Sequence, residues 1–279
     1  MKLSANRYGK HKVRLSKITR LEDRHLFKEM TVDAVLRGAF DPAYTEGDNG
    51  SVLPTDTIKN TVYGLAKNHK LESIEQFGLD LAAHFMDRVP HASSAEIEIE
   101  EKEWVRMVFD GKPHPHGFTG TSSAKRTAYV KHTRGGEVTL IGGVKDFQIL
   151  RTAGSAFVGF MKDEFTVLPE DRDRIMATTL KAEWTYNNTD GDFNGNAAAI
   201  RETILEIFAN HESESVQHTM WEMGKAALAI CGDIDDISMT MPNDHHFAYD
   251  LARFGLENNN EIFSPSEAPY GYIEGTISR

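Results

Sequence analysis

Hydrophobic and polar residues alternate along several stretches of this chain, as they do in β-strands with one buried face. In residues 24–38 the apolar residues, among them Met30, Val32 and Leu36, share one face. Residues 10–20 alternate in the same way, so the two stretches are predicted to pair as an antiparallel hairpin. Further strands are predicted at residues 97–109, 124–133, 137–151, 179–187 and 235–241.

Three segments carry apolar residues at helical spacing instead. The first follows Ser73, which is expected to form a capping box with Gln76, and it is stopped by Pro90. The other two helices are predicted at residues 196–210 and 214–231, and Gly232 is expected to end the last one.

The order strands, helix, strands therefore occurs twice, with a joint near residues 135–145 and no similarity of sequence between the halves. Turn signals at Asp110-Gly111 and Gly135-Gly136 separate neighbouring strands. This order predicts an α+β chain in which helices cover one face of an antiparallel sheet. The other face of the sheet must be polar or be covered, and oligomerisation is an obvious way to cover it.

Composition narrows the class of protein. The 279 residues are 40% hydrophobic and 26% charged, as in an ordinary globular protein. A net charge of −11 argues against general binding to nucleic acid or anionic membranes. No apolar stretch is long enough to span a bilayer. The basic N-terminus could be a transit peptide, but its alternation favours a strand.

The single cysteine, Cys231, can form neither an internal disulfide nor a thiolate metal site with a second cysteine. An intracellular, reducing compartment is the default for such a chain. The C-terminal residues Ser278-Arg279 do not form a peroxisomal address, so a cytoplasmic location is expected.

Common catalytic motifs are absent from the sequence. There is no dinucleotide fingerprint, His-Glu-x-x-His, Gly-x-Ser-x-Gly or paired Cys-x-x-Cys. Gly154 and Gly159 have the spacing of a phosphate loop, but Phe160 and Met161 stand where Lys and Ser or Thr are needed.

Two histidine pairs could suggest a metal. His114 and His116 flank a proline and have no nearby third ligand, so ordinary hydrogen bonds are the favoured interpretation. His245 and His246 would point to opposite faces of a strand and could not chelate together. No metal site is therefore expected.

One segment, residues 147–174, carries the most specific pattern. It holds Arg151-Thr152, then Ser155-x-Phe157-x-x-Phe160, followed by Phe165, Leu168 and Arg174. This closely resembles the signature segment of urate oxidases, with Arg151 in place of the more usual Lys. Other blocks are similar to that family in the same order, at residues 8–10 (Tyr-Gly-Lys), 55–63 (Thr-Asp-Thr-Ile-Lys-Asn-Thr-Val-Tyr), 110–116, 215–220 (Ser-Val-Gln-His-Thr-Met) and 241–247 (Met-Pro-Asn-Asp-His-His-Phe).

The resemblance implies a tunnelling fold (T-fold) with tandem halves at residues 1–140 and 141–279. It implies a homotetramer around a β-barrel tunnel, with active sites at subunit interfaces. It also implies oxidation of urate by O2 and water to 5-hydroxyisourate and hydrogen peroxide, without metal or organic cofactor.

The resemblance assigns roles residue by residue. It implies a proton relay of Lys10, Thr55 and His245, with His246 as a competing assignment for the last position. The substrate-binding positions that it implies are Asp56, Phe157, Leu168, Arg174, Val216, Gln217 and Asn243.

Each of these residues has a plainer interpretation. Lys10 and Arg174 could be solvated charges, and Phe157 could belong to the core. Thr55-Asp56 could merely cap a helix that begins near Ile58. Two rival functions stay open: another T-fold enzyme acting on pterins or GTP, and a purine-binding relative that has lost catalysis. Gln217, in place of the acidic anchor of several such enzymes, favours urate over the first.

Overall fold

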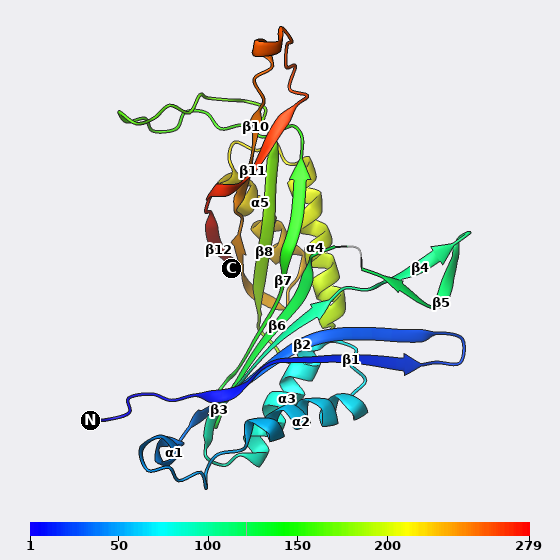
Figure 1. Cartoon of the computed structure of the whole chain (residues 1–279), viewed down its shortest axis with the longest axis vertical. Helices are drawn as coiled ribbons and strands as arrows, with labels where there is room; N and C mark the ends of the chain where they lie inside the picture. The colour runs from blue at the N-terminus through cyan, green and yellow to red at the C-terminus, as the bar shows by residue number, and fades with distance from the viewer. Residues whose placement is uncertain (121) are drawn as a thin grey trace. The chain divides into compact units, whose positions relative to one another are not determined.

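The computed structural model describes residues 1–120 and 122–279. The chain divides into two compact units (Figure 1). Unit 1 contains residues 1–144 and 184–197, and unit 2 contains residues 145–183 and 198–279. The predicted division into tandem halves at 1–140 and 141–279 stays a prediction.

Unit 1 is built on an antiparallel sheet. Its strands follow the order β1-β2-β3-β6 and continue into the first part of β7. Val32 of β2 lies opposite Val13 of β1 on one side and Ile99 of β3 on the other, and Ile99 lies opposite Ala128 of β6. All four side chains are buried. The strand bounds are β1 Tyr8–Arg20, β2 His25–Gly38, β3 Ala92–Lys102, β6 Lys125–Thr133 and β7 Val138–Arg151.

Two helices cover the buried face of this sheet (Figure 1). α2 (Thr55–Asn68) packs against β1, and α3 (Ile74–Arg88) packs against β3 and β6. The close approach of α3 needs Gly78, because a Cβ there would lie 2.9 Å from a methyl of Val130. A short helix α1 (Asp41–Thr45) and a separate hairpin of β4 (Val105–Phe109) and β5 (Lys112–Thr119) complete the unit.

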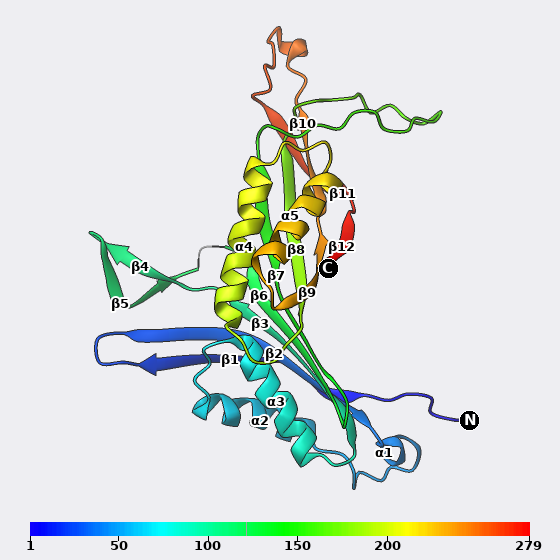
Figure 2. The same ribbon diagram turned by 180° about the vertical axis from the view of Figure 1, so that it is seen from behind.

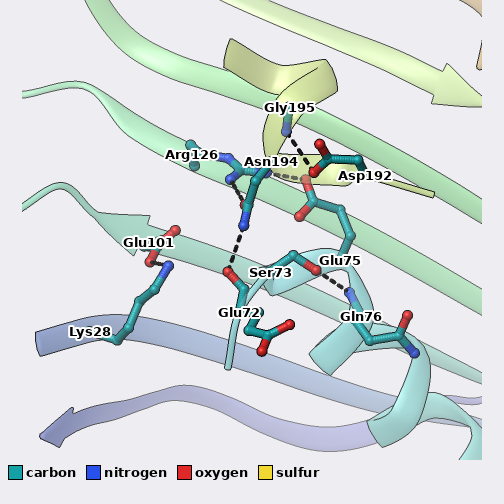
Figure 3. Close-up of polar contacts among 10 residues, drawn as sticks. All are labelled: Lys28, Glu72, Ser73, Glu75, Gln76, Glu101, Arg126, Asp192, Asn194 and Gly195. Atoms are coloured by element: carbon teal, nitrogen blue, oxygen red, sulfur yellow. Dashed lines mark hydrogen bonds and ion pairs between the residues drawn. The ribbon is translucent and has the colours of Figure 1, made fainter. Parts of the chain in front are cut away.

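A polar cluster fastens the start of α3 (Figure 3). Arg126 on β6 donates to the fully buried Glu75 at 2.5 Å and to Asn194 at 2.6 Å. Asn194 in turn donates to the carbonyl of Glu72 at 2.8 Å. Burial raises the pKa of the Glu75 carboxyl, while the Arg126 guanidinium opposes that rise.

Unit 2 places helices on one side of its strands (Figure 2). The second part of β7, most of β8, β9 and β12 are neighbours in that order. α5 packs against β9 and β12, and a Cβ at Gly224 of α5 would lie 2.7 Å from Ile277 of β12. β10 and β11 form a separate antiparallel pair. The bounds are β8 Met176–Tyr186, α4 Phe193–Asn210, α5 Val216–Ile230, β9 Ile234–Thr240, β10 Asn243–Ala248, a 3-10 helix Ala252–Phe254, β11 Phe263–Gly271 and β12 Glu274–Ser278.

These elements confirm the predicted α+β class, the N-terminal hairpin and the three predicted helices, with boundaries shifted by a few residues. Asp110 and Gly111 turn the β4–β5 hairpin with positive φ angles of 49° and 73°. In the part of the chain that the structure describes, no helix combines the length and apolarity needed to cross a bilayer.

Two details of helix capping were predicted wrongly. The Ser73 hydroxyl accepts from the backbone N–H of Gln76 at 3.2 Å, but the Gln76 amide donates to Asp80 instead of returning to Ser73. Only half of the capping box therefore forms. α5 ends at Ile230, and its C-cap residue Cys231 is extended. Gly232 is not among the described glycines with positive φ, so it does not form a left-handed cap.

Candidate active site

A β-bulge in unit 1 determines where Lys10 points. Lys10 pairs with Ala34 and Val13 pairs with Val32, so His11 and Lys12 together stand opposite Asp33. The Asp33 carboxylate fixes this extra residue by contacting His11 Nδ1 at 2.7 Å and accepting the Lys12 N–H at 2.5 Å. Because side chains alternate along a strand, the inserted residue brings Lys10 onto the same sheet face as Val13. That face is the one covered by α2.

The two residues before Lys10 tie β1 to its neighbours. A Cβ at Gly9 would lie 2.0 Å from the carbonyl oxygen of Ala34, so only glycine fits this close strand pair. The half-buried Tyr8 ring packs edge-on against Phe40, and its hydroxyl accepts the N–H of Leu53 at 2.8 Å. Burial raises the pKa of the Tyr8 hydroxyl. Tyr8 thereby fastens the loop that leads into α2 to the strand that carries Lys10.

Thr55 and Asp56 lie in the first turn of α2. The N-cap of this helix is Pro54, without a side-chain hydrogen bond, so the interpretation that Thr55 caps a helix beginning near Ile58 is wrong. The Asp56 carboxylate accepts from Lys59 at 2.5 Å and from Asn60 at 2.9 Å. The Lys59 ammonium, with a smaller contribution from Lys10, lowers the pKa of Asp56. Lys10, Thr55 and Asp56 are called the first half-site below, and their membership of one site stays a prediction.

In unit 2, Phe157 and Arg174 are held next to each other by short backbone pairings. Phe157 exchanges two hydrogen bonds with Asp171, at 2.8 and 3.2 Å, and the Arg174 N–H donates to the Ser155 carbonyl at 2.7 Å. The guanidinium carbon of Arg174 lies 5.3 Å from the centroid of the Phe157 ring. Phe160 stacks on that ring at 4.8 Å.

The Arg174 side chain keeps its donors available. Among the described residues its guanidinium has no hydrogen-bond or ion-pair partner, and its Nε is buried. A planar cation beside an aromatic face suits a flat, anionic ring that accepts hydrogen bonds at its edge.

Val216 and Gln217 begin α5. Ser215 caps this helix by accepting the His218 N–H at 3.1 Å, so Val216 is buried and Gln217 is exposed in the first turn. The preceding Ser213 pairs with the Phe157 segment, since its N–H donates to the Gly154 carbonyl and its own carbonyl accepts from Ala156. The ring-binding segment and the start of α5 are therefore joined.

The remaining predicted residues also lie in unit 2. Asn243 lies opposite Gly271 and His245 opposite Ser266 in the β10–β11 pair, with an irregular register between them. His246 Nδ1 contacts the Asp244 carbonyl at 3.1 Å, whereas the His245 ring lies 5.5 Å from Phe247. The choice between the two histidines for the relay stays a prediction. Leu168 is 47% exposed in the loop before Arg174.

Phe157, Leu168, Arg174, Val216, Gln217, Asn243 and His245 are called the second half-site below. Each half-site lies within one compact unit. Sequence reasoning assigned no role to the supports of these groups: Tyr8, Gly9 and Asp33 in unit 1, and Ser213 in unit 2.

Arg151 also has a structural role that the sequence did not reveal. Its buried guanidinium donates to the carbonyls of Phe208, His211 and Gly154, at 3.1, 2.5 and 2.7 Å. Desolvation lowers its pKa. Its position in the family-like segment was the only signal, since a buried arginine that binds carbonyls leaves no periodic pattern.

His114 and His116 make local contacts. Their rings lie 4.6 Å apart, and the His116 N–H donates to His114 Nδ1 at 3.3 Å. Within residues 1–120 and 122–279, no group of three His, Cys, Asp or Glu side chains is arranged to hold a metal ion.

Comparison with known proteins gives one consistent result. A family model described as uricase matches residues 6–131 and 140–274. The chain is 40% identical to a uricase of Arthrobacter globiformis over 277 residues, covering 99% of this chain and 90% of that protein. It is 37% identical to a uricase of Cyberlindnera jadinii, covering 99% and 97%. The crystal structure of the Arthrobacter globiformis uricase superposes with a TM-score of 0.95 at 39% identity, covering 100% of this chain and 95% of that one.

Proposed function

The chain belongs to the uricase family, and on that premise we propose that it oxidises urate with O2 and water to 5-hydroxyisourate and hydrogen peroxide. Urate loses two electrons, O2 gains them to become peroxide, and the oxygen of water enters the ring. The observation that carries the proposal is the Phe157–Arg174 pair, an aromatic face with an uncommitted guanidinium 5.3 Å from its centre.

Binding of urate is assigned to the second half-site and to Asp56. Phe157 supplies the face on which the purine stacks. The N–H groups of the Arg174 guanidinium donate hydrogen bonds to the edge of the ring, and its positive charge offsets the charge of the substrate. The Gln217 amide, exposed in the first turn of α5, can both donate and accept toward the opposite edge. Leu168, Val216 and Asp56 lie close to the ligand in this proposal, the last two through backbone groups.

The reaction begins with loss of a proton from bound urate. Closed-shell organic molecules react slowly with O2, and the more electron-rich urate dianion can pass an electron to it. In the proposed relay Lys10 takes the proton through the Thr55 hydroxyl, and His245 orients the relay. Asn243, together with Thr55, holds O2, peroxide and then the attacking water above the ring.

We further propose that the active enzyme is a homotetramer, with each site shared between subunits. Exposed apolar side chains support an oligomer: Val108 and Phe109 on the β4–β5 hairpin are 57% and 62% exposed, and Met161 and Val167 before Arg174 are 90% and 94% exposed. Exposed apolar side chains that gather in one patch are typical of an interface between subunits. The compartment we propose is the cytoplasm, on the basis of the single unpaired cysteine.

The test is to mix chelator-treated protein with urate under air. The urate ultraviolet band should disappear while O2 is consumed and peroxide accumulates in equal amounts. A stable urate band would contradict the proposed reaction. Disappearance of the band only after a metal is added would contradict the proposal that no cofactor is needed.

A further inference from the structure

A chain of buried hydroxyl groups lies under the first turn of α5. The Thr219 hydroxyl, on a residue with no exposed surface, donates to Ser213 Oγ at 2.7 Å. Ser213 Oγ donates in turn to the Ser215 carbonyl at 2.8 Å, which also accepts the Thr219 N–H at 3.1 Å. His211 Nδ1 lies 3.4 Å from the Thr219 hydroxyl, at the edge of this group.

The direction of the Thr219 hydroxyl is unusual for a helical threonine. Such a hydroxyl commonly bonds a carbonyl three or four residues earlier in its own helix. Here it reaches the side chain of Ser213, six residues back and outside the helix. Threonine is also a weak helix former, so an alanine or leucine would serve α5 better if helix stability were its only purpose.

Ser213 is the point where the two substrate-binding parts of unit 2 meet. Its backbone pairs with Gly154 and Ala156, directly before Phe157, and the intervening Ser155 carbonyl accepts the Arg174 N–H. On the other side, Ser215 caps the helix turn that presents Gln217. A shift of Ser213 would therefore change the distance between Gln217 and the Phe157–Arg174 pair.

We propose that Thr219 is a positioning residue for substrate binding: its hydroxyl fixes Ser213 and so holds Gln217 in register with Phe157 and Arg174. This inference rests on the proposed function, because it assumes that these three side chains bind the same urate ring. Without the Thr219 hydroxyl, Ser213 Oγ loses its buried donor and the loop between Ser213 and Ser215 gains freedom.

The experiment compares Thr219→Val, which keeps the shape and removes the hydroxyl, with Thr219→Ser, which keeps the hydroxyl. The control is Thr178→Val, because Thr178 is equally buried in unit 2 and its hydroxyl has no hydrogen-bond partner among the described residues. For each protein we would measure KM and kcat for urate, urate affinity under O2-free conditions, and the thermal midpoint.

Thr219→Val should raise KM and weaken O2-free urate binding about tenfold, which corresponds to about 1.4 kcal/mol. Thr219→Ser should restore both to within about twofold of wild type, and Thr178→Val should leave both unchanged. Ser213→Ala removes the other member of the pair and should raise KM in the same direction.

Three results would overturn the inference: an unchanged KM in folded Thr219→Val with only a lower thermal midpoint, an equal rise in Thr178→Val, or no rescue by serine. If Thr219→Val does not fold, an unchanged KM in Ser213→Ala would overturn it. Failure of the wild-type protein to oxidise urate would instead contradict the proposed function, so the two failures are distinguishable.

Discussion

At the residue scale, Lys10 depends on its neighbours for its direction. The bulge at His11 and Lys12 adds one residue to β1, and Asp33 holds the bulge with two short contacts. Without that extra residue, alternation along the strand would turn Lys10 to the face opposite α2. The proximity of Lys10 to Asp56 therefore follows from an irregularity that the hydrophobic pattern does not reveal.

The first prediction concerns Lys10 itself. Lys10→Met keeps much of the length and apolar stem of the side chain and removes the amine that we propose takes the urate proton. We expect kcat to fall at least about 100-fold, since a general base contributes on that order. Urate binding under O2-free conditions should persist, because the proposed binding groups other than Asp56 lie in the second half-site. Loss of binding together with turnover would mean that Lys10 is structural.

At the scale of elements, the close approach of β1 and β2 predicts that alanine at Gly9 and alanine at Gly64 change stability in opposite directions. Gly9→Ala would bring a Cβ to within 2.0 Å of the Ala34 carbonyl oxygen, so the strands must separate. We expect the free energy of unfolding to fall by about 3 kcal/mol. Gly64→Ala on the exposed side of α2 meets no atom within 4 Å and should raise it by about 0.5–1 kcal/mol. Urea unfolding of both variants checks the opposite signs, and equal effects would refute this account of Gly9.

His211, between α4 and α5, is expected to make the stability of the folded protein depend on pH. Desolvation, and next the neighbouring His218 ring at 4.5 Å, lower the pKa of His211 below its ordinary value of 6.5. The unfolded chain therefore binds a proton at His211 before the folded chain does, and stability is lost as the pH falls below about 6.5.

Comparing wild type with His211→Gln tests this sign. Urea midpoints measured at about pH 8 and about pH 5.5 should fall more for wild type than for the variant. Equal losses in the two proteins would show that His211 carries no such pH dependence.

The elements differ in how well the sequence predicted them. Regular alternation of apolar and polar residues located β1 and β2, and the Asp110-Gly111 dipeptide located the β4–β5 turn. Both signals depend only on residues that are neighbours in the sequence. The strand predicted at 235–241 corresponds to β9, and the pair β10 and β11 was not predicted. Segment 263–271 contains two prolines and mostly exposed residues, so it lacks the alternation of a half-buried strand.

The residues of the candidate site were predicted from resemblance to a family and not from a local pattern in the sequence. Phe157, Arg174 and Gln217 have no local spacing that marks a purine site. The first two were predicted from resemblance to the urate oxidase signature segment, and Gln217 from the family-like block at residues 215–220. Their supports, such as Ser213 and Arg151, act through backbone carbonyls and amides of distant segments. Contacts of that kind depend on tertiary structure and leave no pattern along the chain.

At the scale of the whole molecule, the residues of the two proposed half-sites lie in different compact units, the first in unit 1 and the second in unit 2. Proton handling is assigned to Lys10 and Thr55 of unit 1, and ring binding to Phe157 and Arg174 of unit 2. In the proposed homotetramer, each complete site combines the first half-site of one copy with the second half-site of another. In this proposal, a chain with both half-sites would need its oligomer for activity.

Complementation between two inactive variants tests this claim most directly. Lys10→Met disables the first half-site and Arg174→Ala the second, and the two chains would be co-expressed with different tags so that mixed oligomers can be isolated. If both variant chains enter the oligomers equally, about one site in four combines two intact half-sites. Urate oxidation should then recover to about a quarter of the wild-type rate, while each variant alone stays inactive. Mixed oligomers that bind urate but remain inactive would contradict a site shared between copies of the chain.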